Sequence, residues 1–528
     1  MRNCIAPLSL TALLVASTAT AQVTISQQDS EWYTDAQARI AELEAVQPNT
    51  GRAKNVILFV ADGNGVGTNY ATRLWVGQQA GGTGEDHVLP QEMFPNLALV
   101  KTYTTNGQTP DSAPTASAMN TGVKSRNGTI NVGDEGGYDN CDGAATAGLT
   151  TFSEIVTDMG KSVGIVSTAR VTHATPAAVY SKTTNRDWED NTALPENCAQ
   201  KDIAAQLIDA IDAGTIDFVM GGGRQHFLPN GITDDEGAEG RRTDDRNLVQ
   251  EVQDKGWQYV WNDETAAAAD PTKPVFGLFE ASHMQYEEDR TGEPTLAEMT
   301  EMAINNLSNN EEGYFLEVEA GRVDHANHDG NLHRAVTDGA AFAEAIAKAV
   351  EMVNPEETLI IVTADHEHAI SFNGYCGIGT PITGLCYQVD DQGHAHTGEP
   401  NMGLDGKPYT VAGYLNGPGS VMHEIVPEEA EGDHANIDGQ AADSPAQQVA
   451  EGEQPAPQPQ YGGSRPDLTQ EQATDIDYLQ QALVPMTSES HSGEDVAVMA
   501  TGPWAHLFRG VIEQNMIFHV MHKAVTAE

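Results

Sequence analysis

The chain has 528 residues, of which 77 are Asp or Glu and only 27 are Lys or Arg, so its formal net charge is −50. This charge excludes a nucleic-acid-binding surface, because a phosphate backbone would be repelled, and it disfavours an anionic membrane surface. Hydrophobic residues make up 39% of the chain, which is enough for a large core. An acidic surface also suits high ionic strength, so a salty habitat is one hypothesis.

The first 21 residues have the pattern of a signal peptide. A positive start at Arg2 precedes an apolar stretch from Cys4 to Thr18, and Ala19-Thr20-Ala21 is an A-x-A cleavage pattern. No later stretch has the roughly 18 consecutive apolar residues of a transmembrane helix. We therefore expect an exported soluble protein, periplasmic or secreted, with residues 22–528 folding as a single domain.

Four cysteines follow the predicted signal peptide, and four cysteines can pair in three ways. An oxidising compartment favours disulfides. Pairing by nearness in the chain predicts the disulfides Cys141–Cys198 and Cys376–Cys386. The sequence has no C-x-x-C pair, which argues against a thiolate metal site.

Short apolar runs predict buried strands at residues 56–60, 162–166, 216–219, 314–318 and 358–362. Helical patterns lie between them. A capping box at Thr295 and Glu298 begins one helix, and another runs from about Leu332 to Met352. Continuous apolar strands separated by helices indicate an α/β fold with a largely parallel sheet. Residues 427–470 are acidic and rich in Ala, Gln, Gly and Pro, which predicts an exposed insertion.

Polar clusters lie at the ends of these runs. Asp62 follows the first, residues 319–328 follow the fourth, residues 365–368 follow the fifth, and residues 489–495 lead into a further apolar segment. Sites of α/β sheets gather at the carboxyl ends of the strands. Carboxylates with imidazoles suit zinc, and carboxylates with hydroxyls suit magnesium. Asp324 and His328 are four residues apart, so a helical turn would present both to one ion.

A nucleophile candidate opens a further segment. Ser112 lies between Asp111 and a run of small residues, which predicts a serine at the N-terminus of a helix. The helix dipole and free N–H groups there favour an oxyanion or a phosphate. A serine at this position is also a common helix cap. The sequence has no G-x-S-x-G motif, so a hydrolase triad of that kind is not indicated.

Taken together, the ordered motifs resemble the alkaline phosphatase family. The resemblance runs from about Lys54 to Ala524 and is carried by residues 111–113 (DSA), 121–124 (TGVK), 173–177 (HATPA), 221–224 (GGGR), 322–328 (RVDHANH), 363–366 (TADH) and 491–497 (HSGEDVA). It implies a three-layer α/β/α sandwich with a large, mostly parallel central sheet and surface insertions. It also implies a homodimeric enzyme that hydrolyses phosphate monoesters.

The resemblance further implies a role for each matching residue. Ser112 matches the nucleophile that becomes phosphorylated, Arg186 the guanidinium that holds the phosphoryl oxygens, and Asp111 the group that orients this arginine. The implied ligands are Asp324, His328 and His491 for one Zn²⁺, Asp62, Asp365 and His366 for a second Zn²⁺, and Asp62, Thr175 and Glu319 for a third ion, normally Mg²⁺. Whether the third ion helps to deprotonate Ser112 or acts only electrostatically stays open.

Further positions carry additional expectations. His173 and His325 resemble the pattern of one branch of the family, which has histidine at both variable positions near the metals. We expect both side chains to form hydrogen bonds there without touching an ion. Phe279, Glu280 and Glu293 resemble a further Ca²⁺ site of that branch. The segment 393–396 (GHAH) is either a metal site or a solvated loop. The 427–470 insertion is either part of a dimer contact or a solvated loop.

Three other functions compete with this interpretation. A sulfatase needs an arginine four residues after its modified residue, whereas the residue four positions after Ser112 is Ala116. A phosphodiesterase would lack the site at Thr175 and Glu319. A secreted protein that only binds divalent ions would need neither Ser112 nor Arg186. The sequence therefore favours a phosphomonoesterase.

Overall fold

The computed structural model describes residues 25–234, 236–392, 395–424 and 461–528. The chain divides between Gln47 and Pro48 into two units. In the first unit, helix α1 (Glu31–Ala45) has no buried residue, and Trp32 is 87% exposed. The second unit holds every predicted site residue. The predicted signal peptide at residues 1–21 lies outside the described residues.

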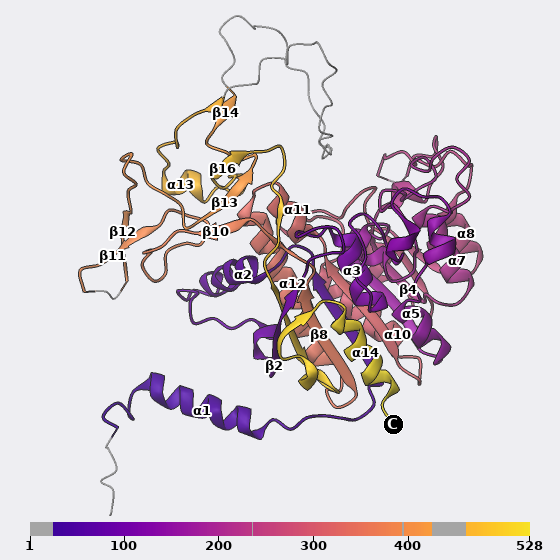
Figure 1. Ribbon diagram of the computed structural model, residues 1–528, viewed down its shortest axis with the longest axis horizontal. Helices are drawn as coiled ribbons and strands as arrows, with labels where there is room; N and C mark the ends of the chain where they lie inside the picture. Colours follow the sequence, from indigo (N-terminus) through magenta and orange to yellow (C-terminus); the bar gives the residue numbers. More distant parts are fainter. Residues whose placement is uncertain (1–24, 235, 393–394, 425–460) are drawn as a thin grey trace, which may run out of the picture. The chain divides into compact units, whose positions relative to one another are not determined.

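A ten-stranded sheet forms the centre of the second unit (Figure 1). Nine of the strands run parallel, and β18 is antiparallel to both of its neighbours. The order is β19 (Gly510–Glu513), β2 (Asn96–Lys101), β18 (Val496–Thr501), β8 (Thr358–Ala364), β1 (Asn55–Ala61), β7 (Tyr314–Ala320), β3 (Ser162–Arg170), β4 (Phe218–Gly222), β6 (Val275–Leu278) and β5 (Gln258–Val260). The five predicted strands are β1, β3, β4, β7 and β8, so the α/β prediction is confirmed.

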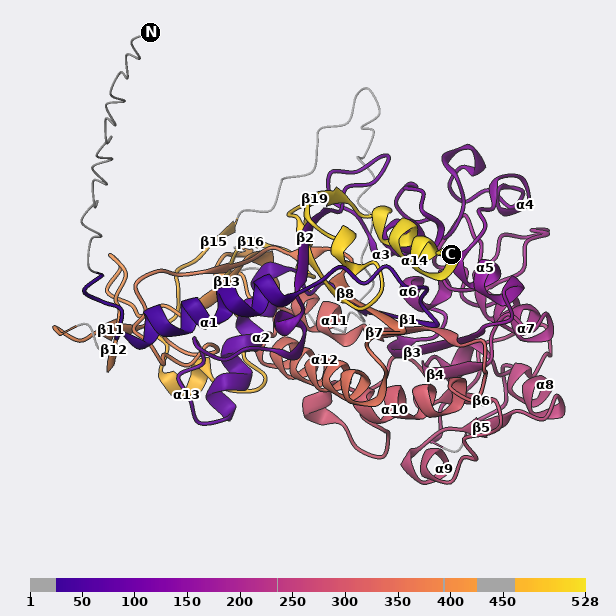
Figure 2. The same cartoon turned by 90° about the horizontal axis from the view of Figure 1, so that it is seen from below.

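Helices cover both faces of this sheet (Figure 2). Strand β1 shows the pattern: Val56, Leu58 and Val60 belong to one apolar core, and Ile57 and Phe59 belong to another. Successive side chains of a strand point to opposite faces. The first core includes α3 (Ser112–Thr121), α5 (Phe152–Asp158), α6 (Ala174–Ala177), α7 (Ile203–Asp212), α8 (Leu248–Asp254) and α14 (Met516–Thr526), and the second includes α9 (Asp263–Ala267), α10 (Leu296–Leu307) and α12 (Leu332–Met352).

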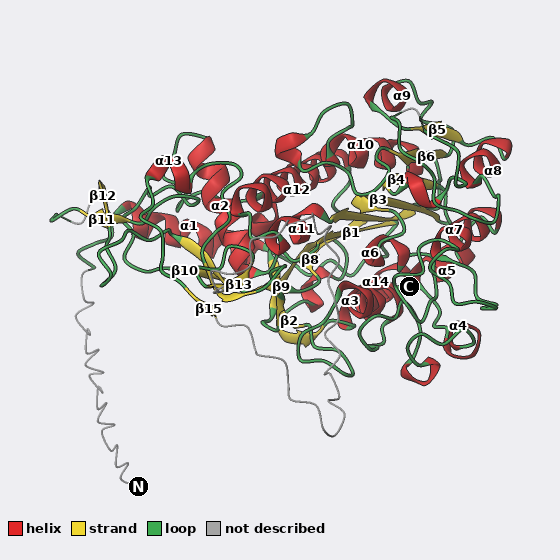
Figure 3. Cartoon of the chain, turned by 90° about the horizontal axis from the view of Figure 1, so that it is seen from above, coloured by secondary structure: helices red, strands yellow, loops and turns green. Residues whose placement is uncertain are grey.

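The opposite view shows the same three layers, with α10 and α12 on one side of the strands and α3 and α14 on the other (Figure 3). Both predicted helices are confirmed, because α10 begins with the Thr295 and Glu298 capping box and α12 spans Leu332–Met352. Among the described helices, none combines the length and apolar character needed to cross a membrane.

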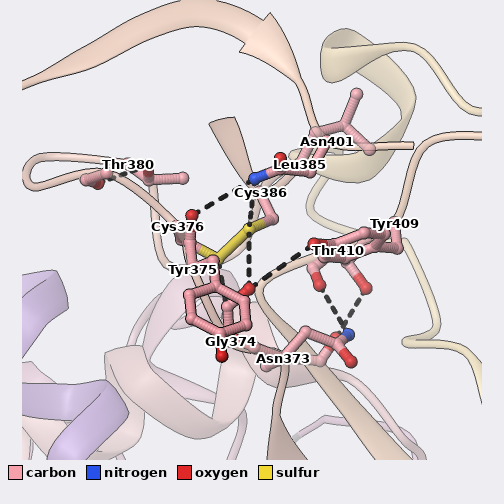
Figure 4. The surroundings of a disulfide bond; sticks show 12 residues. Asn373, Gly374, Tyr375, Cys376, Thr380, Leu385, Cys386, Asn401, Tyr409 and Thr410 are labelled. Carbon is pink, nitrogen blue, oxygen red and sulfur yellow. Dashed lines mark hydrogen bonds between the residues drawn. A yellow bond between two sulfur atoms is a disulfide. The ribbon is translucent and has the colours of Figure 1, made fainter. Parts of the chain in front are cut away.

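A smaller sheet lies beside a third apolar core that α2 (Val66–Gln79) and α12 share. It consists of β10 (Ile370–Phe372), β13 (Ala412–Gly417) and β16 (Ala482–Pro485). Nearby, the Cys376–Cys386 disulfide closes a loop in which the Cys386 N–H donates to the Tyr409 carbonyl at 2.9 Å (Figure 4). Cys141–Cys198 is also present, so both predicted pairings are confirmed.

Short ribbons and helices complete the second unit. The ribbons pair β9 (Glu367–His368) with β17 (His491–Ser492), β11 (Tyr387–Val389) with β12 (His396–Pro400), and β14 (His423–Glu424) with β15 (Tyr461–Gly462). The remaining α-helices are α4 (Gly143–Ala147), α11 (Arg322–His328) and α13 (Gln470–Ala473). Most of the predicted 427–470 insertion, namely residues 427–460, lies outside the described residues.

Phe152 connects the layers and provides a test of the packing. Its ring meets Phe315 of β7 at 4.9 Å and Phe518 of α14 at 6.1 Å, both edge to face. Phe152→Ala should lower the free energy of unfolding by about 3–5 kcal/mol, because a buried aromatic leaves a cavity. Leu404→Ala, at an exposed position, should change it by less than about 0.5 kcal/mol. Urea denaturation of both variants measures the difference, and equal effects would contradict this packing.

Candidate metal centre and nucleophile

Segments far apart in the chain meet at the carboxyl edge of the large sheet. Ala61 of β1 lies opposite both Ala320 of β7 and Ala364 of β8. The three strands therefore end at one level, and Asp62 and Asp365 follow directly. His491 precedes β18, and because that strand is antiparallel, its N-terminal end lies at this same edge.

Ser112 is the first residue of α3, and Asp111 caps the helix by accepting from the Ala113 N–H at 2.8 Å. Ser112 Oγ lies 3.2 Å from both Asp62 carboxylate oxygens and 3.3 Å from His366 Nε2. Ser112, Asp62 and His366 are all buried. The hydroxyl therefore faces a carboxylate and an imidazole instead of bulk water.

Arg186 is held against the cap of the same helix. Its Nη1 donates to Asp111 Oδ1 at 3.1 Å, and its Nη2 donates to His173 Nε2 at 2.9 Å. A guanidinium only donates, so His173 Nε2 must accept. Burial, together with Arg186 and Arg170, lowers the pKa of His173 well below its usual value. His173 is therefore neutral and orients Arg186.

The first candidate metal group lies around α11. Asp324 Oδ1 is 3.4 Å from His328 Nε2 and 3.3 Å from His491 Nε2. Both histidines use Nδ1 to donate to backbone carbonyls, His328 to Glu489 at 2.5 Å and His491 to Pro110 at 2.9 Å. Burial lowers the pKa of His328 to about 4, so its ring is neutral at pH 7.

This arrangement leaves two nitrogen lone pairs facing each other. The Nε2 atoms of His328 and His491 are 3.0 Å apart. A neutral imidazole that donates through Nδ1 has an unprotonated Nε2, and two such atoms repel each other unless a cation or a proton lies between them. The donor set of one carboxylate and two imidazoles fits a zinc ion. The predicted spacing of Asp324 and His328 thus brings both to one point.

The second group consists of Asp62, Asp324 and His366, whose ligand atoms lie within 4.8 Å of one another. Asp365 joins them, with Oδ2 3.1 Å from His366 Nε2. Burial raises the pKa of Asp62 well above its usual value, and the neighbouring carboxylates Asp365, Asp324 and Glu319 raise it further. A buried cluster of this charge needs cations to be stable when ionised.

The third group consists of Asp62, His173 and Glu319, with Thr175 nearby. Glu319 Oε2 accepts from Ser167 Oγ, whereas Glu319 Oε1 and Thr175 Oγ1 are buried and make no hydrogen bond of ordinary geometry within the described chain. Burial raises the pKa of Glu319 to about 8. A carboxylate oxygen of Glu319 and the neighbouring Thr175 hydroxyl, together with Asp62, are ligands of the kind that magnesium prefers.

His325, the other predicted neighbour of the metals, belongs to a cluster of rings. It lies 5.6 Å from His173 and 4.0 Å from His283, measured between ring centroids. The cluster borders the third group through His173. No motif of the sequence indicated a role for His283.

His368 and Glu489 also lack a predicted role, although both stood within the polar clusters of the sequence. His368 Nε2 is 2.8 Å from Asp324 Oδ1, and its Nδ1 contacts Glu489 Oε2. Burial alone would lower the pKa of His368, but these two carboxylates raise it to about 10. The contacts from Glu489 through His368 hold the Asp324 carboxylate in place. They depend on the β9–β17 pairing, which sets His368 opposite His491 and has no local sequence signal.

Glu280 and Glu293, which resemble part of a Ca²⁺ site, are connected through Gln285. Gln285 donates through its backbone N–H to Glu293 Oε1 at 2.7 Å and through Nε2 to Glu280 Oε1 at 3.0 Å. Glu293 Oε2 is buried without a hydrogen-bond partner in the described chain. Burial raises the pKa of Glu293 to about 8. In the 393–396 segment, Gly393 and His394 lie outside the described residues.

Glu317, two residues before Glu319, gives a prediction of pH dependence. It accepts from Asn120 Nδ2 of α3 at 3.0 Å, and burial raises its pKa to about 8. The folded-state pKa lies above the unfolded value of about 4.5, so protonated Glu317 stabilises the fold, and this stability is lost as pH rises through 8. Between pH 5 and pH 9 the loss is about 4 kcal/mol.

Glu317→Gln should remove this part of the pH dependence, while Glu311→Gln, at an exposed position, should keep it. Urea denaturation of the EDTA-treated proteins at pH 5 and pH 9 measures the effect. The same decline in both variants would show that Glu317 does not carry it.

The chain matches the family model described as "Alkaline phosphatase" over residues 53–527. The tissue-nonspecific alkaline phosphatase of Rattus norvegicus is 39% identical over 510 residues, covering 93% of this chain and 87% of the relative. The alkaline phosphatase of Gadus morhua is 38% identical over 489 residues, covering 90% of this chain and 92% of the relative.

Solved structures share the fold. The Thermus thermophilus alkaline phosphatase superposes with a TM-score of 0.61 at 21% identity, covering 92% of this chain and 94% of that one. The alkaline phosphatase of the Antarctic bacterium TAB5 superposes with a TM-score of 0.57 at 20% identity, covering 90% of this chain and 99% of that one. The chain therefore belongs to the alkaline phosphatase family, whose enzymes hydrolyse phosphate monoesters with metal ions and through a phosphoserine.

Proposed function

We propose that this chain hydrolyses phosphate monoesters to an alcohol and inorganic phosphate through a phosphoserine on Ser112. One observation carries the proposal: Ser112 Oγ lies 3.2 Å from Asp62 and 3.3 Å from His366, and Arg186 is tied to Asp111, the cap of the Ser112 helix. The nucleophile and the phosphoryl-binding cation thus sit on one rigid support. A protein that only stores ions would need neither.

The proposed ligands are those of the sequence analysis. Two Zn²⁺ ions would bind to Asp324, His328 and His491 and to Asp62, Asp365 and His366, and one Mg²⁺ to Asp62, Thr175 and Glu319. Bound ions would supply positive charge that lowers the pKa of the Ser112 hydroxyl and stabilises the attacking and departing oxygens. His368 would act as a positioning residue for Asp324. His173 and His325 would act beside the ligands, His173 by orienting Arg186.

The chain's own residues then carry out two displacements. Arg186 donates to the phosphoryl oxygens and holds phosphorus in front of Ser112. Ser112 Oγ forms a bond to phosphorus as the alcohol leaves with the electrons of the ester bond. Water then displaces Ser112 and releases inorganic phosphate. These contacts are made to the phosphoryl group, which every phosphate monoester carries, so monoesters of more than one alcohol should be hydrolysed.

Export to the periplasm or outside the cell rests on the signal pattern at residues 1–21 and on the two disulfides. A Ca²⁺ ion at Glu280 and Glu293 is supported by the buried Glu293 Oε2, which has no hydrogen-bond partner among the residues that the structure describes. A homodimer is supported by an apolar patch of Leu97, Leu99 and Val511 on neighbouring strands at one edge of the large sheet.

Hydrolysis of p-nitrophenyl phosphate tests the reaction. The wild type should turn over with a rate that rises from pH 7 towards alkaline pH, lose activity in EDTA and regain it with Zn²⁺ and Mg²⁺. Ser112→Ala should lose at least about a thousand-fold in kcat, because the nucleophile is absent. Ser371→Ala, an exposed serine of β10, is the matched control. A metal-loaded wild type without turnover, or an active Ser112→Ala variant, would refute the proposal.

Light scattering after size exclusion tests the dimer. The wild type should have twice the mass of one chain, and Leu97→Arg should shift the population towards monomers, because Leu97 is 57% exposed at the patch. Leu404→Arg adds the same charge at an exposed residue outside the patch. A monomeric wild type would contradict the dimer, and a dimeric Leu97→Arg variant would place its interface elsewhere.

A further inference from the structure

A cavity of about 1160 Å³ opens beside Asp111 and Arg186. Its volume is slightly larger than that of typical small-molecule sites, about 300–1000 Å³. A single phosphoryl group needs a small part of this space. The cavity therefore has room for the group to which the transferred phosphate is attached.

The arginines in its wall differ in one respect. Four arginines line the cavity, and three of them have a carboxylate partner: Arg170 with Glu189 at 2.7 Å, Arg186 with Asp111 at 3.1 Å, and Arg241 with Asp190 at 3.3 Å. The fourth, Arg126, forms no hydrogen bond or ion pair through its guanidinium with any residue of the described ranges, and its Nε is buried. In a chain with a net charge of −50, such an unpaired cation stands out.

The other charges of the wall leave this cation available. The carboxylates that face the cavity are Asp111, Asp187, Glu189 and Asp190. Asp111, Glu189 and Asp190 are each paired with one of the other three arginines of the wall. Asp187 follows Arg186 in the chain and adds to the negative potential at that guanidinium. Neutral donors also line the cavity: Asn106, Asn127, Gln225 and Ser282. An anion in the cavity would thus meet Arg126 among neutral polar groups.

The backbone fixes Arg126 close to the phosphoryl site. The Gly128 N–H donates to Asp111 Oδ2 at 2.6 Å, and the Gly128 carbonyl accepts from the Arg186 N–H at 2.9 Å. Thr129 Oγ1 closes the turn by donating to the Arg126 carbonyl at 3.0 Å. Arg126 is two residues from Gly128, so their Cα atoms are at most about 7 Å apart. A second anion near the transferred phosphate is within reach.

We propose that Arg126 binds a second phosphate on the leaving group, so that the enzyme prefers substrates in which the transferred phosphate is joined to another phosphate by an anhydride bond, such as nucleoside diphosphates. The inference rests on the proposed function. The reaction is the same hydrolysis: the terminal P–O bond of the diphosphate breaks, water supplies the new oxygen and the proton, and the nucleoside monophosphate and inorganic phosphate leave. Arg126 binds the inner phosphate and takes no part in bond breaking.

Initial rates with ADP and AMP test this assignment, at saturating Zn²⁺ and excess Mg²⁺. In AMP the only phosphate is the one transferred, whereas in ADP the inner phosphate is the second anion. Arg126→Ala should raise KM for ADP about ten-fold or more and leave kcat and KM for AMP within about two-fold, because one charged hydrogen-bonding partner is lost. Arg126→Lys should recover part of the ADP affinity. Arg509→Ala removes the same charge at an exposed arginine outside the cavity wall and should change neither substrate.

The assignment fails if Arg126→Ala leaves KM for ADP unchanged, or if it raises KM for AMP by the same factor. Activity on AMP shows that each variant is folded and catalytically competent. A wild type that hydrolyses neither nucleotide would instead refute the proposed function itself.

Discussion

Crowding of negative charge at one edge of the large sheet is the constraint on which the site depends. Asp62, Asp324, Asp365 and Glu319 are all buried there. Their mutual repulsion and burial oppose ionisation, and only protons, imidazolium groups or metal cations can compensate. Two carboxylates show the two forms of compensation. The pKa of Asp62 is raised, which favours its protonated form, whereas surrounding histidines hold the pKa of Asp324 low despite its burial. The edge is therefore built for cations.

The frame around this edge explains why the charges cannot move apart. Strands β1, β7 and β8 lie side by side at the centre of the sheet and end at one level. Each supplies its acidic residues from a backbone that hydrogen bonds on both sides. The nucleophile helix α3 is tied to the same frame, since Asn120 bonds to Glu317 of β7 and Thr115 Oγ1 reaches Asp365 Oδ2 at 3.3 Å. Ser112 and the carboxylates thus share one rigid scaffold.

Much of this could be predicted from the sequence, because the signals are local. Apolar runs ending in Asp, Glu or His marked β1, β7 and β8, and the Thr295 capping box marked the start of α10. Ser112 at a helix N-terminus was also a local pattern. What the sequence could not supply was non-local pairing: the antiparallel direction of β18, and the β9–β17 ribbon that sets His368 beside His491. Arg126 became informative only when its missing partner could be seen among neighbouring side chains.

The most direct test of the central claim is calorimetric titration of EDTA-stripped protein with Zn²⁺ and then Mg²⁺, followed by thermal unfolding of each form. If the buried carboxylates and histidines form three cation sites, the chain should take up two Zn²⁺ and one Mg²⁺ tightly, and its melting temperature should rise with each addition. Asp62→Asn, which alters a ligand shared by two sites, should bind fewer ions than the wild type. Absence of tight binding and an unchanged melting temperature in the wild type would contradict the account.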